Sequence, residues 1–163
     1  GPAAVRYPRG AGIGAALEQE LRSIEIGKGQ LKRQGKGVAI LAFGSMVAPS
    51  VAAGSELGAT VANMRFVKPL DVELLKQLAH EHEYLVTVEE GSVMGGAGAA
   101  VAEALAAEGI VKPLLMLGLP DKFIDHGDPQ ALLASVGLDA KGIAASIRQR
   151  FTLGEPRLVV NNS

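Results

Sequence analysis

Short apolar runs that alternate with segments of helical spacing most constrain how this chain can fold. The runs at 37–43, 84–88 and 113–117 are nearly continuous in apolar residues, as expected for strands buried on both faces. A shorter strand is predicted at 60–64. Helices are predicted between and after these runs, at 45–57, 71–80, 97–107, from 128 onward and at 139–151. Because strands separated by helices need crossover connections, the sheet should be mainly parallel.

This alternation predicts an α/β domain of three layers. The central layer is a mainly parallel sheet of about five strands, one of them an antiparallel edge strand, and helices cover both faces. The segment 25–33 alternates modestly in polarity, and we expect it to form that edge strand and to pair with the run at 37–43. Ser45 and Asp71 precede predicted helices and are expected to cap them. Gly58 is expected to end the first helix.

Composition excludes several classes of function. The 163 residues, 48% of them hydrophobic, suit one domain with a core of its own. With 16 basic and 17 acidic residues the net charge is -1, so neither a nucleic-acid nor a membrane partner is expected. The absence of cysteine excludes disulfides, thiolate catalysis and cysteine zinc sites, and allows a cytosolic setting. No apolar run approaches the ~20 residues of a membrane span, and we expect no signal peptide.

A glycine cluster opens the predicted helix at 97–107. Gly95, Gly96 and Gly98 could let an anion approach the free N–H groups of the helix terminus, or could place that terminus against a partner surface. The pattern is not a complete dinucleotide or P-loop motif. The favoured interpretation is a tight turn that lets the helix lie close to the sheet.

The carboxylates and histidines do not form a recognisable active site. Glu89 and Glu90 are adjacent, so on a strand they point to opposite faces and cannot act as an acid/base pair. A solvated or capping role is favoured for them. His80 and His82 lack the spacing of a metal pair on a helix. His126 lies in a turn-rich loop, where it could meet a partner or ligand, or cap a helix.

The first residues have a different character. The segment 1–14 is rich in glycine and proline and has no helical or strand period, which is typical of a linker. Arg6 and Arg9 within it could clamp an anion, since a guanidinium binds phosphate oxygens in a bidentate manner. From the residues alone, a solvated basic tail remains the slightly favoured alternative.

Four stretches of the sequence stand out by their order and spacing. They are Val5-Arg-Tyr-Pro-Arg-Gly10, Met64-Arg-Phe-Val-Lys-Pro-Leu-Asp71, Val88-Glu-Glu-Gly91 with Met94-Gly-Gly-Ala-Gly98, and Gly118-Leu-Pro-Asp-Lys-Phe-Ile-Asp-His-Gly127. Together they resemble the carboxyl-terminal part of the 1-deoxy-D-xylulose-5-phosphate synthase family, and the resemblance covers Gly1 to about Phe151. The second and third stretches have counterparts in transketolases and in the β subunits of 2-oxoacid dehydrogenases, whereas the first and last narrow the resemblance to the synthase.

The resemblance implies a function for a longer protein. Members of the family are cytoplasmic homodimeric transferases that use thiamine diphosphate and Mg²⁺. They condense pyruvate with glyceraldehyde 3-phosphate, release carbon dioxide, and supply isoprenoid, thiamine and pyridoxal precursors. The family's cofactor-binding segments have no counterpart in this chain. We therefore expect the fragment alone to bind neither cofactor nor metal and to be inactive, serving domain packing and dimerisation with the rest of the polypeptide and a second subunit.

The resemblance also implies boundaries and site residues. Residues 1–14 would be the end of the pyrimidine-binding domain and its linker, 15–153 a transketolase C-terminal-like domain, and 154–163 a tail. Arg9, supported by Tyr7, would contact the phosphate of the aldehyde substrate. Residues expected at a domain interface are Glu89, Glu90, Gly95, Gly96, Gly98 and His126. The alternatives are a stand-alone anion- or nucleotide-binding or interaction α/β module, and a piece of a 2-oxoacid dehydrogenase β subunit.

Overall fold

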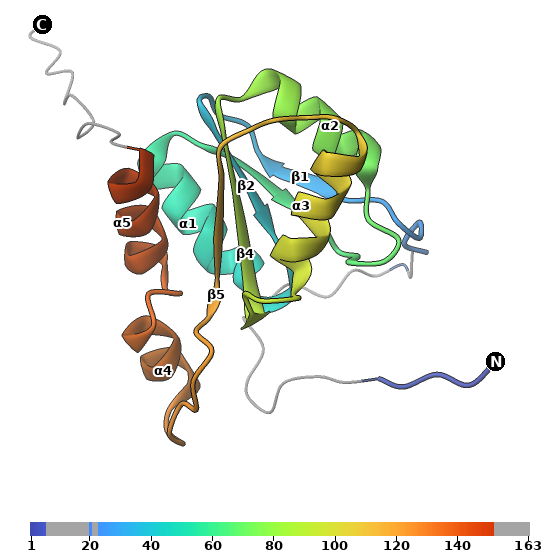
Figure 1. Cartoon of the computed structure of the whole chain (residues 1–163). Helices are drawn as coiled ribbons and strands as arrows, with labels where there is room; N and C mark the ends of the chain where they lie inside the picture. The colour runs from blue at the N-terminus through green and yellow to red at the C-terminus, as the bar shows by residue number, and fades with distance from the viewer. Residues whose placement is uncertain (6–19, 21–22, 152–163) are drawn as a thin grey trace, which may run out of the picture.

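The computed structural model describes residues 1–5, 20 and 23–151, in which a five-stranded sheet lies between two layers of helices (Figure 1). The strand order is β1-β3-β2-β4-β5, and every neighbouring pair is parallel except β1 with β3. The predicted three-layer, mainly parallel α/β fold is therefore confirmed. The strands are β1 (Gln30–Arg33), β2 (Val38–Ala42), β3 (Thr60–Asn63), β4 (Tyr84–Ser92) and β5 (Leu114–Leu119).

The helices divide between the two faces of the sheet. α1 and α5 pack together on one face, and α2 and α3 on the other (Figure 1). None of the helices in the described part of the chain has the length and apolar character that crossing a membrane requires. The helices are the 3₁₀ turn η1 (Gly44–Met46), α1 (Val47–Leu57), α2 (Val72–Glu81), α3 (Ala97–Ala107), α4 (Pro129–Ser135) and α5 (Ala140–Phe151).

The continuous apolar run of β2 is explained by burial on both faces. Val38 and Ile40 point into the core beneath α1 and α5, whereas Ala39 and Leu41 point into the core beneath α2 and α3. Successive strand residues alternate between faces, so a strand covered on both sides needs apolar residues at every position. β2 is therefore the central element around which the sheet is built.

Several predicted helix boundaries are confirmed. α3 spans the predicted 97–107. α2 begins after Asp71, whose side chain accepts a hydrogen bond from the Leu74 N–H, as expected for an N-cap. α1 ends at Gly58, which has a φ of +68°.

The prediction for the edge strand is wrong in its partner. Only Gln30–Arg33 is extended, and it pairs antiparallel with β3 rather than with β2. β2 already has parallel neighbours on both sides, β3 and β4, so its backbone groups are fully used. The free edge belongs to β3, because the chain places β3 and β4 on opposite sides of β2.

Two local predictions also need correction. Ser45 does not cap α1, because the chain leaves β2 through η1 and the helix begins only at Val47, after an N-cap residue that makes no side-chain bond. β4 continues through Glu89 and Glu90 to Ser92, beyond the predicted end at Val88. The proposed domain boundaries fall within or beside 6–19 and 152–163, which lie outside the described residues, so they remain predictions.

Candidate functional site at the carboxyl edge of the sheet

The strand order reverses direction at the carboxyl ends of β2 and β4. The chain passes from β2 to β3 on one side, and then returns across β2 to β4 on the other. In an open α/β sheet, ligands bind at such a switch point, outside the carboxyl ends of the strands. The residues at this place are those of η1 and the last residues of β4, followed by the loop into α3.

Glu89 caps α3 from the end of β4. Its side chain lies on the sheet face that α3 covers, and its two carboxylate oxygens accept hydrogen bonds of 2.8 Å each from the N–H groups of Ala97 and Gly98. The N-cap residue Gly96 makes no side-chain bond of its own. A carboxylate at this position satisfies free N–H groups and opposes the positive end of the helix dipole. The capping role predicted for one glutamate is confirmed.

The glycines make room for this carboxylate. Gly95 has a φ of +72°, which forms the tight turn into the helix. A Cβ on Gly96 would lie 2.6 Å from Oε1 of Glu89, and a Cβ on Gly98 would lie 2.6 Å from Oγ1 of Thr87. Both positions exclude a side chain, so α3 lies close against β4. The favoured tight-turn interpretation agrees with this geometry, and the anion at the helix terminus is a side chain of the protein itself.

Glu90 points away from Glu89 and joins the two strand ends. It is exposed, and its carboxylate accepts a hydrogen bond from the hydroxyl of Ser45 in η1. The backbone N–H of Phe43 donates to the carbonyl of Val88 at 2.9 Å just below. The crevice in which a ligand of an open sheet would bind is therefore bridged by the protein's own side chains.

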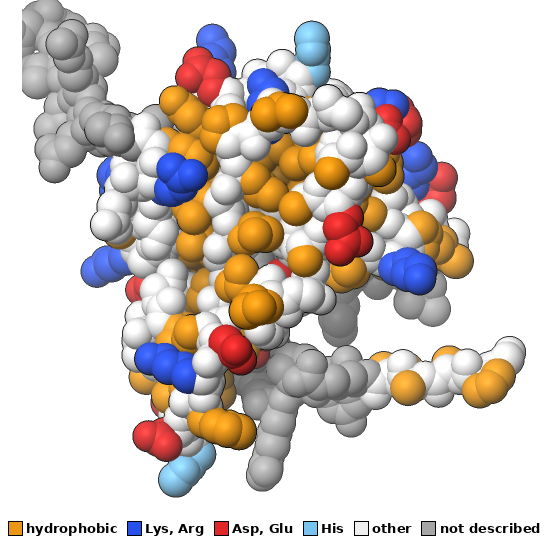
Figure 2. Space-filling view, in the orientation of Figure 1, with side chains coloured by type: hydrophobic (Ala, Val, Ile, Leu, Met, Phe, Trp, Pro, Cys, Tyr) orange, Lys and Arg blue, Asp and Glu red, His pale blue; other side chains and the backbone are white. Residues whose placement is uncertain are grey.

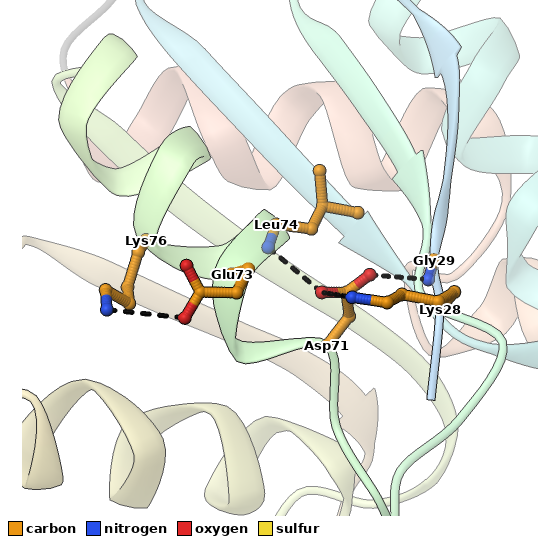
Figure 3. A network of polar contacts seen from close by, with 6 residues as sticks. All are labelled: Lys28, Gly29, Asp71, Glu73, Leu74 and Lys76. Atoms are coloured by element: carbon orange, nitrogen blue, oxygen red, sulfur yellow. Dashed lines mark hydrogen bonds and ion pairs between the residues drawn. The ribbon is translucent and has the colours of Figure 1, made fainter. Parts of the chain in front are cut away.

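A second buried carboxylate, Asp71, lies at the start of α2 near the β1 edge of the sheet (Figure 3). Asp71 accepts hydrogen bonds from the N–H groups of Leu74, at 3.1 Å, and Gly29, at 2.9 Å. The ammonium of Lys28 lies 4.0 Å from the same carboxylate. Asp71 thus joins the start of α2 to the segment that leads into β1.

The loop between β5 and α4 contains His126. The imidazole is exposed and does not join Glu89 or Glu90. Asp128 ends the loop as the N-cap of α4, accepting from the Ala131 N–H at 2.9 Å. Phe123 in the same loop is fully exposed. A shallow groove runs along the first half of this loop, lined by Ser92, Leu119, Pro120, Asp121, Lys122, Phe123 and Ile124.

The other histidines have structural roles or lie at the surface. His82 is buried, and its Nδ1 lies 3.0 Å from the carbonyl oxygen of Leu78 and its Nε2 2.7 Å from Oγ1 of Thr60. His80 is exposed on α2. Within the described ranges, no three side chains of His, Asp or Glu gather closely enough to hold a metal ion. Among the residues that the structure describes, the carboxyl edge therefore presents no cluster of metal ligands.

Two contacts at this edge were not predicted from the sequence. The Ser45–Glu90 bond joins residues far apart in the chain, and no local sequence pattern predicts it. Gly118 on β5 also belongs to the cluster, because a Cβ there would lie 2.7 Å from the carbonyl oxygen of Gly91. Gly118 follows the strand predicted at 113–117, which indicates a position at the carboxyl edge, but no sequence pattern indicates its contact with Gly91. Arg9 and Tyr7 lie outside the described residues, and their role remains a prediction.

This chain matches one protein family, and the two relatives described below have the same name. The family described as "Transketolase, C-terminal domain" matches residues 27–143. A 1-deoxy-D-xylulose-5-phosphate synthase of Burkholderia ambifaria is 64% identical over 155 residues, covering 92% of this chain and 24% of the relative. The synthase of Cupriavidus necator is 61% identical over 164 residues, covering 98% of this chain and 26% of the relative.

A solved structure has the same fold. It is described as "Split gene transketolase, inactive beta4 tetramer", superposes with a TM-score of 0.73, and is 39% identical to this chain. The match covers 80% of this chain and 44% of the solved one. This chain thus spans about a quarter of the length of the curated relatives that it matches.

Proposed function

This chain belongs to the transketolase C-terminal domain family, and on that premise we propose that it serves as the carboxyl-terminal domain of a 1-deoxy-D-xylulose-5-phosphate synthase. The observation that carries the proposal is the 64% identity across 92% of the chain to a synthase of that name. The whole enzyme would be a cytoplasmic homodimeric transferase. It would condense pyruvate with glyceraldehyde 3-phosphate and release carbon dioxide, supplying precursors of isoprenoids and thiamine.

Thiamine diphosphate and Mg²⁺ would be held by other parts of the longer protein. The described residues provide no cluster of ligands that could hold Mg²⁺. The helix terminus best placed for a diphosphate is that of α3, and Glu89 already accepts from two of its N–H groups. A carboxylate there would repel a diphosphate. We therefore expect the chain alone to be inactive.

The role that remains for this domain is packing against its neighbours. The loops after β4 and β5 carry apolar side chains in exposed positions, Met94 and Phe123. Glu89 and the surrounding glycines hold the first of these loops in one conformation. A rigid, partly apolar edge suits contact with another domain or a second subunit. His126 and Glu90 lie on the same edge and would be rim residues of such a contact.

Arg9 is proposed as the residue through which this chain reaches the substrate. The family resemblance assigns it to the phosphate of the aldehyde, with Tyr7 in support, and a guanidinium is the side chain best suited to a phosphate group. In an active full-length enzyme, Arg9→Ala should raise the KM for glyceraldehyde 3-phosphate and leave pyruvate binding unchanged. Unchanged kinetics with the aldehyde would refute the assignment.

A chimeric enzyme tests the whole proposal. The matching quarter of the Burkholderia ambifaria synthase is replaced by this chain, and carbon dioxide release from pyruvate and glyceraldehyde 3-phosphate is measured. We expect the chimera to be active, and both the truncated relative and this chain alone to be inactive. Activity of the chain alone, or a folded but inactive chimera, would contradict the proposal.

The alternatives receive less support. A stand-alone anion- or nucleotide-binding module would need free N–H groups at the start of α3, and Glu89 accepts from two of them. Calorimetry with inorganic phosphate checks this directly, because such a module would show saturable binding. No feature of the described edge specifically supports a piece of a 2-oxoacid dehydrogenase β subunit. The synthases matched above are 61% to 64% identical to this chain.

A further inference from the structure

The two edges of the sheet differ in how they are protected against further pairing. β1, at one edge, is four residues long, carries Lys32 and Arg33, and has an irregular register against β3 between Leu31 and Arg33. Short length, positive charge and irregular pairing are the devices by which natural edge strands avoid joining another strand. β1 is therefore a protected edge.

β5, at the other edge, has none of these devices. Its six residues, Leu-Leu-Met-Leu-Gly-Leu, contain no charge and no proline. Its pairing with β4 is in register from Leu114 to Leu117, and the irregularity further along falls between Val88 and Ser92 of β4, on the inner side. A long, uncharged and regular edge strand is a template for another strand.

The orientation of the β5 backbone shows which groups are free. The N–H of Leu85 in β4 donates to the carbonyl of Pro113 at 3.0 Å. The backbone polar groups of Pro113 and of every second residue after it, Leu115 and Leu117, therefore point toward β4. The N–H and C=O groups of Leu114, Met116 and Gly118 consequently point away from the sheet. In the sheet formed by the described residues, β5 has no neighbour on that side.

Apolar side chains accompany this free edge. Met116, in the middle of the strand, is 37% exposed, whereas the residues of the inner strand β2 are all buried. Val111, just before β5, is almost fully exposed. Figure 2 shows hydrophobic side chains gathered over β5 and the adjoining part of α3, with few charged side chains among them.

We propose that the free edge of β5 pairs antiparallel with β5 of a second copy of this chain, across a two-fold axis at Met116. The proposal names the surface of the dimerisation proposed above and rests on it. Antiparallel pairing with an identical strand uses the same residues on both copies and closes after two, which is the commonest symmetry of oligomers. Leu114 of each copy would then lie opposite Gly118 of the other.

Charge supports a second copy as the occupant. Two identical charged edges would repel each other, whereas the uncharged β5 opposes its own copy without that cost. The ammonium of Lys112, just before β5, donates to the carbonyl oxygen of His82 at 2.8 Å, so this basic group is bound within its own chain.

The mass of the 163-residue chain in solution gives the first test. Met116→Lys places two positive charges opposite each other at the axis, and Leu31→Lys is the matched control, since Leu31 is an apolar residue of β1 with 38% exposure. By analytical ultracentrifugation up to ~100 μM, we expect a dimer for the wild type and for Leu31→Lys. Met116→Lys should weaken the dimer at least about tenfold while circular dichroism shows the native fold.

A cross-link tests the pairing without relying on a disruptive variant. The chain has no cysteine, so a single introduced cysteine reports on one position. Residues facing each other in an antiparallel hydrogen-bonded pair have Cα atoms about 5.5 Å apart, within the range that a disulfide spans. Oxidised Met116→Cys should form a covalent dimer, and Leu31→Cys should stay monomeric on a denaturing gel.

The outcomes distinguish failure of the proposed dimerisation from failure of its assignment to β5. A wild-type chain that stays monomeric overturns both the proposed dimerisation and this assignment. A wild-type dimer that persists in folded Met116→Lys, or that cross-links equally through Leu31→Cys, overturns only the assignment to β5. The chimeric enzyme activity described above does not depend on either result.

Discussion

The helices α2 and α3 begin in similar surroundings and are capped in different ways. Asp71 and Glu89 are each 7% exposed, and each accepts two backbone N–H bonds. Asp71 is the N-cap residue of its own helix and receives one bond from that helix and one from Gly29. Glu89 lies in the preceding strand, and both of its bonds come from the following helix. One cap is local in sequence, whereas the other depends on the packing of a helix on a sheet.

The largest expected effect comes from removing the non-local cap. Glu89→Ala leaves the buried N–H groups of Ala97 and Gly98 without acceptors, and we expect a loss of ~3 kcal/mol in the free energy of unfolding. Urea denaturation measures it. Glu90→Ala is the control, since Glu90 is exposed and its carboxylate accepts a bond from Ser45, and it should cost less than about 1 kcal/mol. Equal losses for the two variants would contradict the comparison.

Crowding the same cap should cost somewhat less. Gly96→Ala puts a Cβ against the carboxylate of Glu89, and we expect a loss of ~2 kcal/mol from overpacking. In the Glu89→Ala background the cost should shrink, because one of the clashing groups is gone. Gly127→Ala is the control, since its Cβ would meet Leu132 at an ordinary 3.5 Å. Strictly additive losses would show that Gly96 and Glu89 do not interact.

The local cap should be less costly to remove. Asp71→Ala is expected to cost ~1–2 kcal/mol, the usual effect of losing an N-cap together with one bond to another segment. Asp71→Asn keeps one oxygen and should recover about half of the loss. Amide hydrogen exchange separates the two bonds. We expect faster exchange at both Leu74 and Gly29 in the alanine variant. An unchanged rate at Gly29 would show that its bond to Asp71 does not contribute to stability.

The smallest effect is expected at the surface between the same two helices. Lys76 on α2 forms ion pairs with Glu108 at 3.2 Å and Glu73 at 3.4 Å. Its hydrogen bond to Glu108, then the charges of Glu108 and Glu73, raise the pKa of Lys76 above its ordinary value of 10.5. A raised pKa gives stability that is present below the unfolded-state pKa and is lost as pH rises through the folded-state pKa.

Lys76→Met measures this contribution. The difference in stability between the variant and wild type should be small at neutral pH, should shrink in high salt, and should vanish as the pH rises past the raised pKa. Denaturation midpoints at a series of alkaline pH values provide the readout. A difference that does not depend on pH would assign the effect to packing of the lysine stem instead.

The fold was largely predictable because its signals are local. The unbroken apolar run of β2 indicates burial on both faces, the Asp71 cap and the Gly58 C-cap lie beside their helices, and α3 matches its predicted range. The site was only partly predictable. The opposite orientation of Glu89 and Glu90 follows from strand alternation, and the structure shows one of them buried and the other exposed. The bond from Ser45 to Glu90 has no local signature.

What the sequence alone determined is therefore the set of elements, their parallel arrangement and the family resemblance, because periodicity, capping residues and motifs are properties of short segments. The tertiary structure decided which strands became neighbours. It placed β1 beside β3, since β2 already had two partners, and it left β5 as an open edge. It also directed the Glu89 carboxylate to α3, because only the packed helix brings two N–H groups within reach of a strand residue.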